Sequence, residues 1–245
     1  MNLFLGIFEL IVVFSGVLIM DKFFGKWGLY TWMALAVVFA NIQVSKQIDL
    51  ATVSVSLGNV FFASTYLATD ILNEKYSDKA SRNAVKIAAA ALVAYIVFAQ
   101  ITQAFVPNSY DTVDQSMKMI FAMSVRITAA SGLMFILSNW CDVILYQQLK
   151  EKTGGKYMWF RNNISTMVCN CAENFAFSLL AFAGTYSVAY CLQIAVAGSL
   201  IEMVIAFCDT PFLYIAKAFN KNSGILLEKE DEEEEIVESS KEVNA

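Results

Sequence analysis

The stretch from Arg161 to Gly184 is apolar enough to cross a membrane, yet it carries three polar side chains in its middle. Asn170, Glu173 and Asn174 are spaced by three and four residues, which places them on one face of a helix. An ionised carboxylate at the centre of a bilayer costs about 2.5–3.5 kcal/mol on insertion scales. A chain keeps such a group where it is paired, faces water or binds a ligand. We therefore interpret this helix as one wall of a polar ligand pocket.

Polar and charged side chains also interrupt or border the other apolar runs. They are Asn41, Lys46, Asp70, Glu74, Arg126, Asp142, Glu202 and Asp209. Asn41 fits a hydrogen bond between helices as well as a ligand contact. Asp70 and Glu74, four residues apart, fit a charge cluster at a helix end as well as a functional gate. Arg126 lies within an apolar run, where a guanidinium is expected to pair with a carboxylate.

Several classes of chemistry are excluded by what the chain lacks. It has no histidine, so it has no Ser-His-Asp triad and no histidine metal site. Its five cysteines form no CxxC pair, and no GxxxxGK[ST] loop for ATP is present. The sequence has no stripe of basic residues of the kind that indicates nucleic-acid binding. We expect a protein that is not an enzyme, with no metal and no cofactor.

The composition places the chain in a membrane. Of its 245 residues 58% are hydrophobic, against about 45–50% apolar residues in soluble domains, and the mean hydropathy is +0.55. We predict an all-α fold, a polytopic bundle of six to seven transmembrane helices of about 20 residues each. The expected spans are Leu3–Met20, Leu29–Ser45, Thr52–Leu72, Ala84–Phe105, Met119–Gln147, Arg161–Gly184 and Tyr186–Phe219. A count of six leaves out the first.

Short connections are predicted between these spans. Asp21–Gly28 is expected to be a loop, Val106–Lys118 an acidic loop, and Gln148–Asn162 a basic loop. Pro211 is expected to break or bend the last helix, because proline removes a backbone hydrogen bond and clashes with the preceding turn. The carbonyl groups freed there either serve a binding site or only bend the helix.

The chain divides into a helical domain over residues 1–222 and an acidic tail over residues 223–245. The tail has a run of like charge without aromatic residues, which is typical of disorder. Of the 17 Lys and Arg residues, Lys46 and Lys118 fall on one side of the predicted spans and Arg126 inside one, leaving 14 on the other side. The positive-inside rule then predicts a cytoplasmic C-terminus.

Five segments, in order, carry motifs of a known family. They are ANIQVSK at Ala40, YLATDILNEKY at Tyr66, RITAASGLMFILSNWCDV at Arg126, STMVCNCAENFAFSLLAFAG at Ser165 and DTPFLY at Asp209. Together they resemble the bacterial queuosine precursor transporters, small membrane proteins related in plan to vitamin-uptake proteins. The chain departs from the family pattern at Glu173 and Asn174, where the family usually has Asp followed by Ser or Thr. It also departs at Glu202, where the family often has Lys.

The resemblance implies import of a 7-deazaguanine base, a prequeuosine base or queuine, through the bacterial cytoplasmic membrane for salvage into tRNA queuosine. Glu173 suits the guanine-like edge, since one carboxylate accepts hydrogen bonds from a ring N–H and an adjacent amine. Asn170 and Asn41 can each donate and accept. Asn174 and Glu202 complete the expected ligand site.

Two further features bear on the ligand. Phe175, Phe177 or Trp140 would stack on a flat base. The prequeuosine amine and queuine are cationic and the nitrile precursor is neutral, so Glu202 in place of lysine favours a cationic ligand.

The expected gating or coupling groups, which are charged, border or enter the predicted spans. They are Lys46, Asp70, Glu74, Arg126 and Asp142. The expected partners are the lipid bilayer and a small deazapurine; homo-oligomerisation and a separate energising module stay open. The main alternative is a substrate-capture subunit for another vitamin, energised by an ATPase module. A membrane-embedded enzyme is disfavoured by the missing histidine, and a purely structural protein by acids on three helices.

Overall fold

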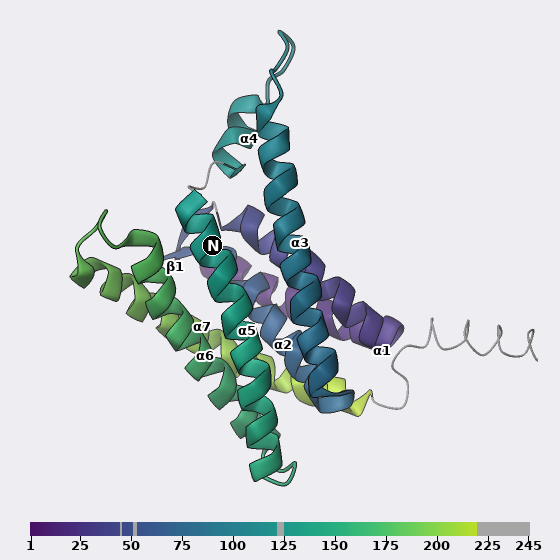
Figure 1. Ribbon diagram of the computed structural model, residues 1–245. Helices are drawn as coiled ribbons and strands as arrows, with labels where there is room; N and C mark the ends of the chain where they lie inside the picture. The colour runs from purple at the N-terminus through teal and green to yellow at the C-terminus, as the bar shows by residue number, and fades with distance from the viewer. Residues whose placement is uncertain (45, 51–52, 122–124, 220–245) are drawn as a thin grey trace, which may run out of the picture.

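The computed structural model describes residues 1–44, 46–50, 53–121 and 125–219. The predicted all-α helical bundle is confirmed, with one small hairpin added to it (Figure 1). The elements are α1 (Asn2–Gln43), β1 (Gln47–Leu50), β2 (Val53–Ser56), α2 (Asn59–Lys75), α3 (Asp78–Ala104), α4 (Asp114–Phe121), α5 (Val125–Lys152), α6 (Met158–Phe182) and α7 (Val188–Ala218). The acidic tail lies outside the described residues.

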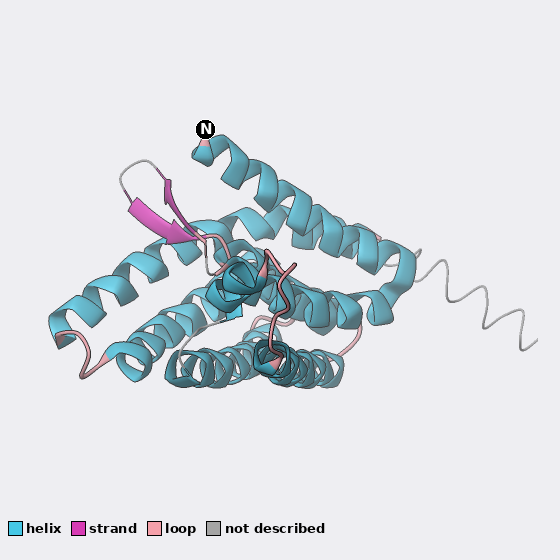
Figure 2. Cartoon of the chain, turned by 90° about the horizontal axis from the view of Figure 1, so that it is seen from above, coloured by secondary structure: helices cyan, strands magenta, loops and turns pink. Residues whose placement is uncertain are grey.

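Helix α1 folds back on itself, so it supplies two of the predicted spans. The loop predicted at Asp21–Gly28 is wrong: the segment is helical apart from Gly25, whose φ of 55° is one that glycine adopts without strain. The two halves then pack closely, since a Cβ added at Gly16 would lie 2.5 Å from the ring of Trp32. Figure 2 shows the first half leaving the N label and the second half returning towards the hairpin.

The hairpin replaces the beginning of the third predicted span. The span predicted to begin at Thr52 is wrong there, because Val53–Ser56 is a strand paired antiparallel with Gln47–Leu50. The sequence VSVS alternates apolar and polar residues, which is the strand period. Helix α2 begins only at Asn59 and continues to Lys75.

Helix α2 is the centre of the bundle. It contacts α1, α3, α5 and α7, and every residue from Ala63 to Asn73 is buried. A helix buried on all sides is normally apolar all round, but this one carries Ser64, Thr65 and Asp70. Its 17 residues give a length of about 26 Å, close to the hydrocarbon thickness of a bilayer. The helix that is hardest to reach from lipid is therefore one of the most polar.

The helix predicted over Met119–Gln147 falls on two described helices, and residues 122–124 between them lie outside the described residues. α4 ends at Phe121 and α5 begins at Val125 and continues to Lys152. The loop predicted over 106–118 contains the start of α4, whose first turn follows a turn in which Asp111 accepts hydrogen bonds from the backbone N–H groups of Val113 and Asp114. Helix α3 ends at Ala104, three residues before Pro107.

Helices α6 and α7 pack against each other, and α6 also packs against α5. The predicted basic loop over 148–162 is shorter than expected, because α5 extends to Lys152 and α6 begins at Met158. Of the break or bend predicted at Pro211, the break does not occur, since α7 continues through this residue to Ala218.

Three helices, α1, α3 and α7, are long and apolar enough to cross a membrane by length and composition. Their outer faces expose large apolar side chains such as Phe8, Phe98 and Phe207, as contact with lipid requires. The basic residues gather at one end of the bundle: Lys75 pairs with Asp21, and Lys22 lies over the ring of Phe219 at 5.3 Å. These contacts agree with the predicted grouping of basic residues on one side, of which Lys221, Lys229 and Lys241 lie outside the described residues.

Candidate functional site

Polar side chains recur at each helical turn on the inner faces of α2 and α5. They are Tyr66, Asp70 and Glu74 on α2, and Ser138, Asp142, Tyr146 and Lys150 on α5. A spacing of four residues keeps each set on one face, with about 6 Å between successive members. Side chains of α6 and α7 complete three layers, here called the first, middle and basic layers.

The first layer, Tyr66, Ser138, Glu173, Asn174 and Glu202, is built around Glu173. The Tyr66 hydroxyl donates to Glu173 Oε2 at 2.6 Å and also meets Ser138 Oγ. A tyrosine has one hydroxyl proton, so Ser138 must be the donor to Tyr66. Three helices thus fix one carboxylate oxygen. Glu173 itself stays partly exposed.

A second carboxylate of the same layer comes from α7. Asn174 donates to Glu202 Oε2 at 2.6 Å and to the backbone oxygen of Asn170 at 2.9 Å. Glu202 lies near enough to Glu173 for their charges to interact. Within the described part of the chain neither carboxylate makes an ion pair. The layer therefore concentrates negative charge without a counter-charge of its own.

The middle layer, Asp70, Asp142 and Asp209 with Asn162 and Thr166, lies one turn further along α2 and α5. The three carboxyl groups come from three helices and are at most 1% exposed. Asp209 accepts from Asn162 Nδ2 at 2.7 Å, and Asp142 accepts from Thr166 Oγ1 at 3.5 Å. Neither oxygen of Asp70 has a hydrogen-bond partner among the described residues.

The basic layer, Glu74, Tyr146, Lys150, Arg161 and Lys217, is held together by ion pairs to Glu74. Glu74 contacts Arg161 Nη2 at 2.5 Å, Lys217 Nζ at 2.7 Å and Lys150 Nζ at 3.4 Å. Arg161 is fully buried; it also donates to the backbone oxygen of Lys156 and lies over the ring of Tyr146 at 5.4 Å. One carboxylate thus ties α2 to three other helices at this end of the bundle.

Comparisons with known proteins place the chain in a family. A family model described as "Putative vitamin uptake transporter" matches residues 56–216, which hold every residue of the three layers except Lys217. The chain belongs to this family. It is also 34% identical over 217 residues to a protein of Bacillus subtilis (strain 168) named "Probable queuosine precursor transporter", covering 88% of this chain and 95% of that protein. No solved structure matches.

Membership of the family makes this chain a membrane protein of a transporter family and confirms the resemblance drawn from its motifs. Four of the five predicted ligand-site residues lie together: Asn170, Glu173 and Asn174 on α6 and Glu202 on α7. Asn170 is buried, and its side-chain oxygen has no partner within the described ranges.

The fifth, Asn41, lies elsewhere. It donates to the backbone oxygen of Val37 in its own helix at 2.7 Å. It lines a cavity of about 20 Å³ with Tyr95 and Gln100 of α3 and Phe121 of α4, room for roughly one water molecule. The structure therefore does not bring Asn41 to the first layer.

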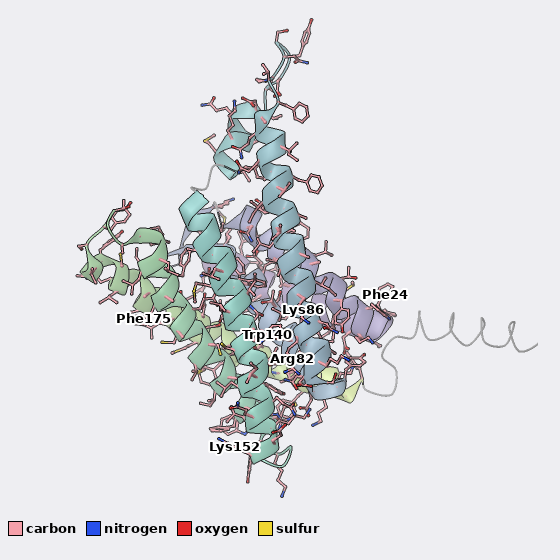
Figure 3. The ribbon with its side chains drawn as sticks, in the orientation of Figure 1. Phe24, Arg82, Lys86, Trp140, Lys152 and Phe175 are labelled. Atoms are coloured by element: carbon pink, nitrogen blue, oxygen red, sulfur yellow. The ribbon has the colours of Figure 1, made fainter. Side chains whose placement is uncertain are left out.

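The predicted gating or coupling residues are divided among several places. Asp70 and Asp142 lie in the middle layer and Glu74 in the basic layer. Lys46 is exposed between α1 and β1. Arg126 lies in the first turn of α5, and its side chain is outside the described part. Figure 3 shows Trp140 beside Lys86 of α3, whereas Phe175 lies on the outer edge of α6.

Sequence reasoning left nine residues of these layers out of the predicted site, among them Tyr66, Arg161 and Asp209. Tyr66 was treated only as part of a motif, and Arg161 as part of a basic loop, although both are buried partners of carboxylates. Asp209 was noted beside Pro211 but left out of the site. A signal was present: Asn162, Thr166, Asn170 and Asn174 continue one stripe at intervals of four residues.

Proposed function

We propose that this protein imports a queuosine precursor, a cationic 7-deazaguanine, through the bacterial cytoplasmic membrane for salvage into tRNA queuosine. The observation that carries the proposal is the first layer, where the charges of Glu173 and Glu202 interact and neither has an ion-pair partner among the described residues. Like charges inside a helical bundle that lack a counter-ion suit a ligand that brings one. The relative's name points to the same class of ligand.

Glu173 is assigned to the guanine-like edge of the base. Tyr66 holds only its Oε2, so Oε1 and the second acceptor site of Oε2 remain for the ring N–H and the exocyclic amine. The unpartnered oxygen of Asn170, three residues away on the same face, supplies a further acceptor. A ligand N–H there would relieve the cost of a buried acceptor without a donor, about 1–3 kcal/mol.

Glu202 is assigned to the ammonium group that distinguishes the prequeuosine amine and queuine from the neutral nitrile. Asn174 orients it from α6 by a hydrogen bond of 2.6 Å. Because Glu202 lies on a different helix from Glu173, the two carboxylates can bind opposite ends of one small ligand. Tight binding of both ends would close α6 and α7 on the base, which is the first step of a transport cycle.

Uptake of labelled precursors by cells that lack their own synthesis tests these assignments. Glu173→Gln should reduce uptake of every precursor by at least about tenfold, since it removes a charge-assisted hydrogen bond worth about 1.5–3 kcal/mol. Glu151→Gln makes the same chemical change on an exposed face and should leave uptake at the wild-type level. Normal uptake by the Glu173→Gln variant, inserted at normal levels, would rule out the role.

Glu202→Lys tests the second assignment. It places a cation beside Glu173 and should shift preference from the amine to the nitrile by about tenfold or more, since the ammonium would then meet a like charge. An unchanged preference between the two precursors would remove Glu202 from the site.

The same proposal places the C-terminus in the cytoplasm, following the basic end of the bundle and the positive-inside rule. We propose that the chain acts without a separate energising module. Uptake by purified protein in lipid vesicles tests this point. Uptake in cells but not in vesicles would instead support the substrate-capture alternative, in which an ATPase complex completes the transporter.

A further inference from the structure

The middle layer differs from its neighbours in having too many acceptors. Four buried oxygen atoms lack a donor in the part of the chain that the structure describes: both of Asp70, Oδ2 of Asp142 and Oδ1 of Asn162. Asp142 and Asp70 are close enough for a hydrogen bond once one of them carries a proton. Asp209 is a third acid beside them.

The Asn162 amide is an observation independent of the acids. Its side chain is fully buried and its Nδ2 donates to Asp209 at 2.7 Å, so its unpartnered Oδ1 lies at the same cluster. A buried amide oxygen requires an O–H or N–H donor. No described protein group donates to it, so a donor that enters from solvent would satisfy it.

A metal ion does not fit this requirement. The described residues contain no group of three or more His, Cys, Asp or Glu side chains arranged to hold one. The nearest fixed cation is Arg161, whose Nη2 is bound to Glu74 of the basic layer. A proton is the cation that both supplies a donor and needs no cage of ligands.

The charged and titratable groups that interact with Asp70 and Asp142 come from α2, α5, α6 and α7. They are Asp209 of α7, Arg161 and Cys169 of α6, Tyr146 of α5 and Glu74 of α2 itself. Arg161 has an unpartnered buried Nε–H. It is therefore the positive charge available to the layer when a proton leaves.

We propose that Asp70 and Asp142 share a proton that is taken up on one side of the membrane and released on the other in each cycle, so that import is proton-coupled. The inference rests on the proposed transport function, since the proton serves that cycle. The O–H bond forms on a carboxylate from outside water and breaks to inside water. No oxidant or other reactant takes part. Arg161 turns from Glu74 towards Asp70 as the proton leaves.

The position of the layer supports coupling. On α2 it lies one turn from Tyr66 of the first layer and one turn from Glu74 of the basic layer, about 6 Å each way. A ligand that moves Tyr66 or Glu173 acts on α2 and α6, and both helices contribute to the middle layer. An opening of the basic layer exposes Asp70 to water on that side.

The first arm of the test measures the proton itself. Infrared spectra of the purified full-length protein in vesicles should contain a carbonyl stretching band of a buried protonated carboxylic acid that disappears at high pH. The band should be lost in Asp70→Asn or Asp142→Asn and kept in Asp111→Asn, an exposed control. Identical spectra for wild type and both buried variants over the whole pH range would overturn the proposal. Unchanged elution and a melting temperature no lower than that of wild type exclude misfolding of the variants.

The second arm measures coupling with labelled prequeuosine amine in the same vesicles, at zero membrane potential. One proton per ligand and a gradient of one pH unit, acid outside, allow at most about tenfold accumulation above protein-free vesicles. Loss of accumulation in Asp70→Asn and Asp142→Asn supports the proposal. Wild-type uptake that is the same with and without the pH gradient overturns it. Absence of any deazapurine uptake by wild type contradicts the proposed function instead, and the infrared arm then decides the proton site.

Discussion

The Asp21–Lys75 pair and the middle layer are buried to the same degree but differ in how their charges are satisfied. Lys75 Nζ reaches both oxygens of Asp21, at 2.9 and 2.7 Å, and the two side chains are 0% and 2% exposed. Asp70 is 1% exposed and has no such partner within the described segments. The charges of Asp21 and Lys75, which join two helices, neutralise each other inside the fold. The carboxyl groups of the middle layer have no such partner and remain available to a group that comes from outside the chain.

Breaking the paired region should give the largest effect on stability. Lys75→Ala leaves Asp21 buried without its cation, and removing one partner of a buried ion pair costs about 3–5 kcal/mol. Chemical unfolding in detergent measures the loss. Lys79→Ala, at an exposed position in the first turn of α3, should change the free energy of unfolding by less than about 0.5 kcal/mol. Equal effects of the two variants would show that the Asp21–Lys75 pair contributes no more to the free energy of unfolding than an exposed lysine does.

The same measurement on the middle layer should have the opposite sign. Asp142→Asn keeps an oxygen for Thr166 and adds an N–H for the unpartnered oxygens of Asp70. One net hydrogen bond is worth about 0.5–1.5 kcal/mol, so this variant should be more stable than wild type by that amount while losing gradient-driven uptake. A loss of stability comparable to that of Lys75→Ala would show that the middle layer is as structural as the ion pair.

Helices α6 and α2 differ in how much of the candidate site could be predicted from the sequence. On α6 the stripe of Asn170, Glu173 and Asn174 follows from helical period and membrane cost, and these residues do lie together beside Glu202. On α2 the sequence shows a polar helix but not that it occupies the centre, so Tyr66 gave no sign of its contact with Glu173. That contact joins residues 107 positions apart. Only the packing of the helices brings them together.

The fold-back of α1 and the hairpin were missed for a related reason. Asp21–Gly28 contains two lysines and two glycines, which locally favour a loop, but packing keeps it helical on both sides of Gly25. Val53–Ser56 was read as the start of an apolar run, although its period is two. Asn41 shows the limit of motif reasoning, because its family motif is matched while its amide is bonded within its own helix.

The smallest effect on stability is expected at Gly198, one turn before Glu202. A Cβ there would lie 2.5 Å from Asn174 Oδ1, the end of a side chain that can rotate away. In Gly198→Ala the gain in helix propensity, about 1 kcal/mol, should offset most of the lost Asn174–Glu202 hydrogen bond, so unfolding changes by less than about 1 kcal/mol.

Binding should respond more strongly than stability in this variant. Without Asn174 to orient it, Glu202 should bind the amine about tenfold more weakly, while the neutral nitrile, which does not need that carboxylate, should bind almost as before. Competition between the two precursors in an uptake assay measures the ratio. If both precursors weaken equally, Asn174 shapes the pocket as a whole and does not act through Glu202. If neither changes, the charge of the first layer serves some group other than the ligand's ammonium.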